Sequence, residues 1–184
     1  MTHFALSIRG ATREDIPAIV ECANSSSSEE EEVGFGTPFF ERTFNDVRRL
    51  STAWRDPNVV VSDLADQEEV IVAETAGQVA GYVTVEDRGE DLELVNIDVR
   101  RKQQGQGIGS RLVQFVEERA VREGKRAVTL GTTRNAQGVP WKSLPWWQKL
   151  GYTVTGEEEN AYTRSIGVGV REIRLRKPVC GTGA

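Results

Sequence analysis

Residues 97–110 read IDVRRKQQGQGIGS, and this stretch decides how the rest of the 184-residue chain is interpreted. An alternating apolar pattern ends at Val99, three alternating glycines run from Gly105 to Gly109, and an amphipathic helical pattern follows over residues 110–123. Glycines let the backbone take positive φ angles and approach a ligand closely. The first turn of a helix presents free N–H groups and the positive end of the helix dipole. This strand, turn and helix therefore predict an anion site, and a pyrophosphate is its natural guest.

The spacing of the glycines separates three phosphate-binding motifs. A P-loop requires Gly-Lys-Ser/Thr, which this turn lacks. The dinucleotide fingerprint requires Gly-x-Gly-x-x-Gly in a parallel strand–helix–strand unit, whereas a meander of hairpins precedes this turn. The remaining pattern, Gln104-x-x-Gly107-x-Gly109, resembles the Gln/Arg-x-x-Gly-x-Gly/Ala signature of the GNAT N-acetyltransferase superfamily. In that family the loop binds the pyrophosphate of acetyl-CoA.

Outside this stretch, hydrophobic periodicity predicts alternating elements along one domain. Strands are expected over residues 4–9, 70–74, 79–86, 92–99, 127–130, 152–154 and 170–175. Helices are expected after a capping box formed by Thr12 and Asp15, and over residues 39–54, 110–123 and 145–150. A polar run over residues 25–32 predicts a loop. We expect a single domain over residues 1–177 and a disordered tail over residues 178–184.

The resemblance extends over most of the chain. Ile8-Arg9 with Thr12 and Asp15 is similar to the opening strand and first helix of the family. Residues 146–152, WWQKLGY, resemble its late Leu-Tyr-x-x-Leu-Gly-Phe element, and Val-Pro-Trp at 139–141 resembles a subgroup. The resemblance implies an α/β (α+β) fold, with a GNAT-like mixed, mostly antiparallel central sheet flanked by helices.

Composition narrows the classes of partner. The chain has 28 acidic and 23 basic residues, hence a net charge of −5, which disfavours nucleic acid as a partner. No apolar run approaches the roughly 18 residues of a membrane helix, and no secretory signal is visible, so a cytoplasmic protein is expected. One histidine and two cysteines disfavour a metal site. A homodimer is possible, because dimers are common among relatives.

The resemblance also assigns roles to single residues. Acetyl-CoA as co-substrate is expected to contact Ile97, Asp98, Val99, Gln104, Gly105, Gln106, Gly107, Ile108, Gly109 and Ser110. The Val99 N–H is expected to donate to the thioester carbonyl. Glu93 is the candidate general base, on the strand face that a period of two assigns to Ile97 and Val99; a solvent-facing glutamate is the alternative. Glu86 and Asp98 are weaker candidates.

The general acid is the point where this sequence departs from the family. Many relatives carry a tyrosine where this chain has Trp147, and an indole N–H is no usable acid at neutral pH. Tyr152 is expected in the core. Tyr82, Tyr162, the Ser143 hydroxyl and water remain as alternatives.

The acceptor is predicted from aromatic and acidic residues. Residues assigned to acceptor binding are Glu29, Glu32, Trp141, Trp146 and Trp147; the alternatives are a solvated loop for the glutamates and core packing for the tryptophans. Acidic loops and aromatic walls favour acetyl transfer to a primary amine of a small cationic molecule, an aminoglycoside or amino sugar. A protein or peptide acceptor is the second hypothesis, and a degenerate acyl-CoA-binding sensor domain is the third.

Overall fold

A computed structural model of the chain describes residues 5–25 and 68–179. These residues form a seven-stranded sheet with the strand order β1-β2-β3-β4-β5-β7-β6. The strands are β1 (Leu6–Gly10), β2 (Glu68–Thr75), β3 (Gln78–Asp87), β4 (Asp91–Val99), β5 (Ala127–Arg134), β6 (Thr153–Glu158) and β7 (Arg171–Pro178). The helices are η1 (Arg13–Asp15), α1 (Ile16–Ser25), η3 (Arg101–Gln103), α3 (Ile108–Arg122), α4 (Leu144–Lys149) and α5 (Ala161–Ile166). The predicted mixed, mostly antiparallel sheet flanked by helices is confirmed.

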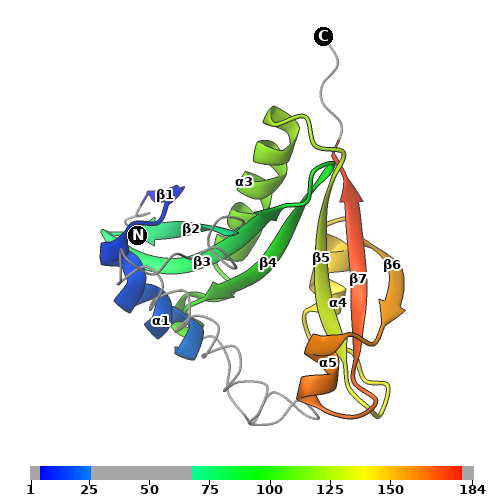
Figure 1. The fold of residues 1–184 in the computed structure, drawn as a ribbon. Coiled ribbons are helices and arrows are strands. Elements are labelled where there is room, and N and C mark those ends of the chain that lie inside the picture. Colours follow the sequence, from blue (N-terminus) through cyan, green and yellow to red (C-terminus); the bar gives the residue numbers. More distant parts are fainter. Residues whose placement is uncertain (1–4, 26–67, 180–184) are drawn as a thin grey trace, which may run out of the picture.

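The sheet is antiparallel except at one place. Strands β1 to β4 pair in chain order as a meander. β4 then pairs in parallel with β5, and α3 makes the crossover that a parallel pair requires. β7 lies between β5 and β6 and is antiparallel to both. In Figure 1, α1 lies in front of the sheet, and α3 and α4 lie behind it.

Each face of the sheet has an apolar core. Successive residues of β3 point to opposite faces, so Val83 packs with Leu112 of α3 while Tyr82 packs with Cys22 of α1. Because both faces are covered, β3 is buried without interruption from residue 79 to residue 86. This explains why its sequence is more apolar than a half-exposed strand would be.

Asp15 fixes the start of α1. Its carboxylate accepts hydrogen bonds from the Thr12 N–H at 2.7 Å and the Thr12 hydroxyl at 3.2 Å, which gives the predicted capping contact. Arg9 of β1 donates to both oxygens of Asp15, at 2.7 and 3.0 Å, and to Glu74 of β2 at 2.9 Å. The Arg9 hydrogen bonds hold the pKa of Asp15 down at about 2, although burial acts in the opposite direction. One arginine thus joins β1, β2 and the start of α1.

The structure differs from the predicted element boundaries at several places. α3 begins at Ile108, two residues before the predicted start at Ser110, because Gly107 is its N-cap. β5 continues past the predicted residue 130 to Arg134, and α5 was not predicted at all.

The predicted tail starts too early. Pro178 ends β7, and the Val179 N–H donates to the Arg126 carbonyl at 3.0 Å. The loop predicted over residues 25–32 also starts too early, because Ser25 is the last residue of α1. Residues 26–32 of that loop, the predicted helix over residues 39–54 and the rest of the tail lie outside the described residues.

We expect Asp15→Asn to lower the free energy of unfolding by about 1 kcal/mol at neutral pH. The estimate is modest because the Arg9 side chain is 41% exposed and its ion pair is partly screened by solvent. The pKa of Asp15 is lowered on folding, so this stability is present above the ordinary value of 3.8 and is lost as the pH falls through about 2. Urea unfolding of both proteins between about pH 2 and about pH 7 measures the effect. The difference should close toward acid pH, and a pH-independent difference would contradict this account.

Candidate active site

β4 and β5 run side by side over only the first part of β4. Their parallel pairing joins Asp91–Leu94 to Ala127–Leu130, and among the described residues no paired position follows Leu94. β5 instead stays paired with β7 over its full length, so the sheet opens between β4 and β5 (Figure 1). The candidate site is built around this opening.

A bulge at Val95 lies where the two strands part. Thr84 and Val85 are consecutive in β3, but they pair with Asn96 and Leu94, so Val95 has no partner across the ladder. Its side chain is 37% exposed. The extra residue shifts the alternation of every residue that follows it in β4.

The bulge decides which side of the sheet each candidate residue occupies. Glu93 precedes it and lies opposite Glu86, on the face that carries α1. Ile97 and Val99 follow it and pack against the core on the face of α3. The prediction that Glu93 shares a face with Ile97 and Val99 is therefore wrong, because one inserted residue inverts the alternation.

The main chain of β4 after the bulge has polar groups on the side of the opening. The Arg100 N–H donates to the Ala80 carbonyl at 2.8 Å, which fixes the phase of the ladder with β3. Main-chain groups of successive residues point to opposite edges of a strand, so those of Ile97 and Val99 point away from β3 and toward the opening. The Val99 carbonyl accepts a hydrogen bond from the Gln104 amide at 3.0 Å. The N–H groups of Ile97 and Val99 are donors along the edge of the opening.

Asp98 differs from the two residues beside it. The same alternation points its main-chain groups toward β3, and its carboxylate accepts a hydrogen bond from the buried Tyr82 hydroxyl at 2.7 Å. The side chain of Asp98 and its main-chain groups thus point away from the opening, unlike the predicted role in cofactor binding. The thiol of Cys22 lies close to Asp98, 3.6 Å from its carbonyl oxygen. Burial raises the pKa of Cys22 to about 12, so this thiol is no nucleophile at neutral pH.

The glycine turn follows the open end of β4. Gly105 and Gly107 take φ angles of 75° and 83°, in the left-handed region that favours glycine. Gly107 is the N-cap of α3, and its carbonyl accepts the first helical bond from the Arg111 N–H at 3.0 Å. The N–H groups of residues 108–110 precede that bond and have no acceptor within the helix. The first turn of α3 has no acidic residue, so these donors and the helix dipole make the start of α3 suited to binding an anion.

Glutamine side chains hold the turn in shape. Gln103 donates to the Thr75 hydroxyl at 2.9 Å and so ties the turn to the end of β2. Gln106 donates to the Lys102 carbonyl at 3.3 Å, within the turn itself. The predicted contacts of the turn with an anion therefore fall mainly to its main-chain N–H groups.

Trp146 lies at the glycine turn. A Cβ atom added at Gly109 would be 3.4 Å from Trp146 Cζ2 and 3.7 Å from Val99 Cγ2. The indole thus reaches from α4 to the first turn of α3, beside the end of β4. Trp146 and Glu93 lie on opposite faces of the sheet. The position of Trp146 therefore does not favour its predicted role in acceptor binding.

Trp147 lies in the core. Its side chain is 4% exposed, and its ring centroid lies 4.4 Å from that of Trp146 and 5.4 Å from that of Tyr152. This burial leaves no indole surface for an acceptor, so the predicted acceptor role of Trp147 is not retained. Tyr152 is buried as expected, and burial raises the pKa of its hydroxyl.

The other predicted residues are not brought together. Trp141 is half-buried, and its N–H donates to the Thr133 carbonyl at 2.7 Å. The Ser143 hydroxyl lies 3.3 Å from the Thr132 hydroxyl. Residues 29 and 32, the two predicted acceptor glutamates, lie outside the described residues.

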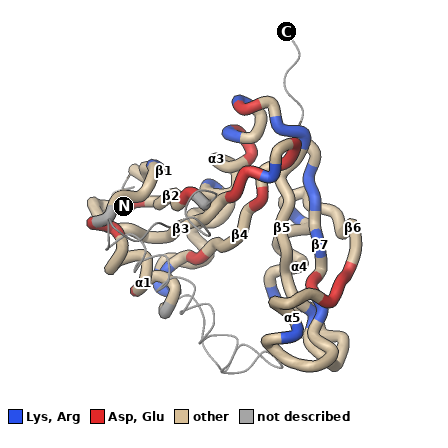
Figure 2. The backbone as a smooth tube through the Cα atoms, in the orientation of Figure 1, with Lys and Arg blue, Asp and Glu red and all other residues tan. Residues whose placement is uncertain are grey.

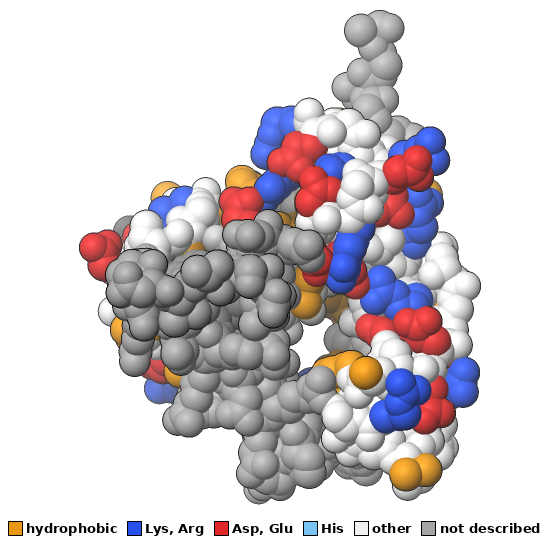
Figure 3. All heavy atoms as spheres, in the orientation of Figure 1, with side chains coloured by type: hydrophobic (Ala, Val, Ile, Leu, Met, Phe, Trp, Pro, Cys, Tyr) orange, Lys and Arg blue, Asp and Glu red, His pale blue; other side chains and the backbone are white. Residues whose placement is uncertain are grey.

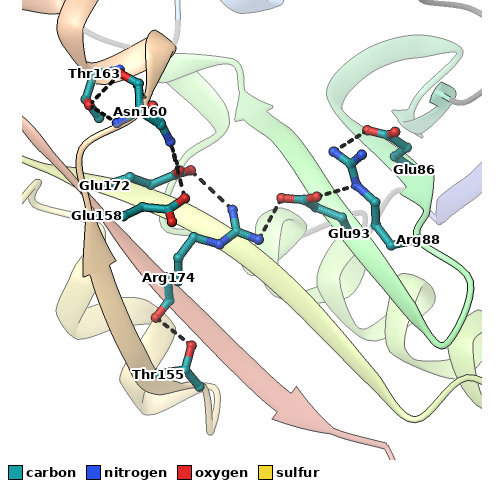
Figure 4. Close-up of polar contacts among 9 residues, drawn as sticks. All are labelled: Glu86, Arg88, Glu93, Thr155, Glu158, Asn160, Thr163, Glu172 and Arg174. Atoms are coloured by element: carbon teal, nitrogen blue, oxygen red, sulfur yellow. Dashed lines mark hydrogen bonds and ion pairs between the residues drawn. The ribbon is translucent and has the colours of Figure 1, made fainter.

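Glu93 is held between two arginines (Figure 4). One carboxylate oxygen pairs with Arg88 Nε at 2.7 Å and the other with Arg174 Nη2 at 2.8 Å. Arg88 also pairs with Glu86 at 2.8 Å, and Arg174 pairs with Glu172 at 3.2 Å. The side chains of Glu86 and Glu93 are 10% and 13% exposed, whereas that of Arg88 is 52% exposed. Two nearly buried carboxylates thus share one accessible guanidinium.

Arg174 reaches Glu93 by passing over β5. Its register partner in β5 is Gly131, and a Cβ atom added there would lie 3.1 Å from Arg174 Nη1 and would overlap the Glu172 carboxylate. Glu172 in turn accepts a hydrogen bond from the side chain of Asn160, the N-cap of α5. Burial lowers the pKa of Arg174, but its pairing with Glu93 and Glu172 outweighs this and the pKa is raised.

Sequence reasoning missed Arg88, Arg174 and Gly131. The signal that it overlooked is in β7, where Glu172, Arg174 and Arg176 stand at every second position and so share one face. Basic residues lie along β7 in Figure 2. Figure 3 shows charged side chains of both signs on the part of the molecule that contains β7. A charged face on a strand that lies inside a sheet indicates partner charges on neighbouring strands.

Two kinds of feature are missing from residues 5–25 and 68–179. No helix there combines the length and apolar character needed to cross a membrane. No cluster of three His, Cys, Asp or Glu side chains is placed there to hold a metal ion.

Comparison with known proteins assigns the family. The family model described as the Acetyltransferase (GNAT) family matches residues 28–152, which is more than half of the chain. The chain therefore belongs to the GNAT family of acetyltransferase enzymes. Among curated proteins, an uncharacterized N-acetyltransferase of Bacillus subtilis (strain 168), YvbK, is 26% identical over 106 residues. That match spans 57% of this chain and 66% of the length of YvbK.

Solved structures agree with the fold. A GNAT-family protein from Desulfovibrio desulfuricans has a TM-score of 0.67 at 17% identity, covering 96% of this chain and 100% of that one. An aminoglycoside 6'-N-acetyltransferase complexed with coenzyme A has a TM-score of 0.65 at 17% identity, with coverages of 97% and 99%. At these identities the likeness establishes the fold alone.

We expect Trp147→Tyr to lower the free energy of unfolding by about 2 kcal/mol. The smaller ring leaves a cavity in the core and buries a hydroxyl group where an apolar edge had packed. Trp141→Tyr, at a half-buried position, is the matched control and should cost less than about 1 kcal/mol. Urea titrations followed by circular dichroism measure both values. Equal losses in the two variants would show that the surroundings of Trp147 are not packed as described.

Proposed function

We propose that this chain is an acetyl-CoA-dependent N-acetyltransferase whose acceptor is a primary amine on a small cationic molecule, with an aminoglycoside or other amino sugar favoured. The opening between β4 and β5 is the observation that carries the proposal. It combines main-chain donors along its edge with N–H groups at its end that are suited to binding an anion. The family match supports the reaction. A similar fold was solved with coenzyme A, in an aminoglycoside 6'-N-acetyltransferase, and this agrees with the proposed co-substrate.

The main chain fits the two ends of acetyl-CoA. The turn over residues 104–110 would receive the pyrophosphate on its N–H groups, and the pantetheine arm would lie along β4 beside Ile97 as an added strand. Trp146, beside Gly109, would give that arm an apolar wall. The Val99 N–H would donate to the thioester carbonyl oxygen, where negative charge develops as the amine attacks. The new C–N bond forms as the C–S bond breaks, and coenzyme A leaves as the thiolate.

Glu93 is the proposed general base. The attacking amine is protonated in solution, and Glu93 would take its proton directly or through one water molecule. Both oxygens of Glu93 are paired, but Arg88 is the more exposed of its two partners. The acceptor ammonium would replace the Arg88 guanidinium between Glu86 and Glu93. These two carboxylates favour a positively charged acceptor over a neutral or anionic one.

The proposal is tested by thiol release from acetyl-CoA with a panel of amines. The panel contains aminoglycosides, polyamines, amino acids and basic peptides at equal concentration. We expect turnover with aminoglycosides or other amino sugars at a kcat/KM at least about tenfold above that with the other classes. Turnover confined to peptides would replace the proposed acceptor with a protein one. Tight binding of acetyl-CoA without any turnover would indicate a sensor domain.

The role of Glu93 is tested by Glu93→Gln. This variant keeps the shape of the side chain but cannot accept a proton, so we expect kcat to fall by about 10²–10⁴-fold while acetyl-CoA binding by calorimetry stays within about twofold. Glu90→Gln is the matched control, because Glu90 belongs to an exposed ion pair with Arg126 outside the opening. Its kcat should stay within about twofold of the unmodified enzyme. An unchanged kcat in Glu93→Gln would remove Glu93 from the chemistry.

A further inference from the structure

We propose that Arg174 is a positioning residue for Glu93, and that Gly131 is the gap in β5 through which Arg174 acts. This inference rests on the proposed function, since it deepens the account of the same site. The observation behind it is an ion pair between β4 and β7, two strands that are not neighbours in the sheet.

The gap lies at the place where the sheet opens. Leu94 and Leu130 form the last pair between β4 and β5, and Gly131 is the next residue along β5. Any side chain at this position would meet the Arg174 guanidinium and the Glu172 carboxylate. Its φ angle is not among the positive values found in the chain, so clearance rather than backbone conformation requires a glycine here.

Arg174 is itself fixed from the other side. Nη2 pairs with Glu93 and Nη1 with Glu172, so one planar guanidinium joins two carboxylates. Glu172 accepts a hydrogen bond from Asn160, which caps α5. Glu93 is therefore linked through Arg174 and Glu172 to a helix at the far edge of the sheet (Figure 4).

The two arginines at Glu93 have different roles. Arg88 follows β3, and its side chain is 52% exposed, so an incoming cation can exchange with it. Arg174 lies within a paired strand, is 28% exposed and is braced by Glu172. It holds one oxygen of Glu93 in a fixed direction while the other oxygen meets the acceptor.

The test compares Arg174→Gln with Arg176→Gln. Arg176 lies on the same strand and face and pairs with Asp91 at 3.2 Å, but it has no ion pair with Glu93. In Arg174→Gln we expect kcat to fall by about 10–100-fold and the KM for acetyl-CoA to stay within about twofold, because the base is misdirected while the cofactor contacts are intact. In Arg176→Gln both values should stay close to those of the unmodified enzyme. Equal losses of kcat in both variants would reduce Arg174 to a structural role.

Two further variants separate charge from clearance. Arg174→Lys keeps the charge but cannot span both carboxylates, so its kcat should lie between those of Arg174→Gln and the unmodified enzyme. Gly131→Ala removes no charged group, but its Cβ atom would displace the Glu172 carboxylate and with it the brace of Arg174, so kcat should fall about 5–20-fold. Full activity of Gly131→Ala would overturn the proposed clearance.

Crystal structures of the unmodified protein and Arg174→Gln give a readout that does not depend on turnover. We expect the Glu93 carboxylate to keep one orientation in the former and to turn away from β7 in the latter. If the unmodified protein acetylates no amine, the proposed function fails, and this comparison still decides whether Arg174 orients Glu93. An unchanged Glu93 in Arg174→Gln would overturn the inference even in an active enzyme.

Discussion

The loss of pairing between β4 and β5 after Leu94 and Leu130 is the constraint on which the rest of the structure depends. A strand edge inside a sheet leaves main-chain donors and acceptors without their ladder partners, and such groups require other partners. The bulge at Val95, the glycine turn and the indole of Trp146 all gather at this edge. Each of them shapes the space in which a substrate can supply the missing partners.

The two faces of the sheet cover the opening with different kinds of side chain. On the face of α3, apolar side chains such as Ile97 and Val99 join the core. On the other face, ion pairs connect the strands on the two sides of the opening, with Glu93 between Arg88 and Arg174. Carboxylates with so little exposure need compensating cations, because desolvation penalises an unpaired charge. The ion pairs thus cover one half of this face, and α1 covers the other half.

Local patterns in the sequence were sufficient for the fold and for the glycine turn at the start of α3, because the glycines at 105 and 107 and the helix that follows them are consecutive in the chain. The surroundings of Glu93 were not accessible in this way. The bulge at Val95 has no sequence signature, and it inverted the predicted face. Arg174 and Gly131 come close to Glu93 only through the strand order. The sequence allowed both core packing and acceptor binding for Trp147, and its packing against Tyr152 decided for the core.

The groups that face the opening have a consequence for the divergence of the family. The N–H groups of Ile97 and Val99 and those of residues 108–110 belong to the main chain, so among side-chain exchanges only one to proline deletes them. Selection on such a site acts on backbone shape, and it leaves most positions free to drift. The Desulfovibrio desulfuricans protein retains the fold over its whole length at 17% identity. In the proposed acceptor site the side chains around Glu86 and Glu93 are under no such protection, so single substitutions there would change the choice of acceptor.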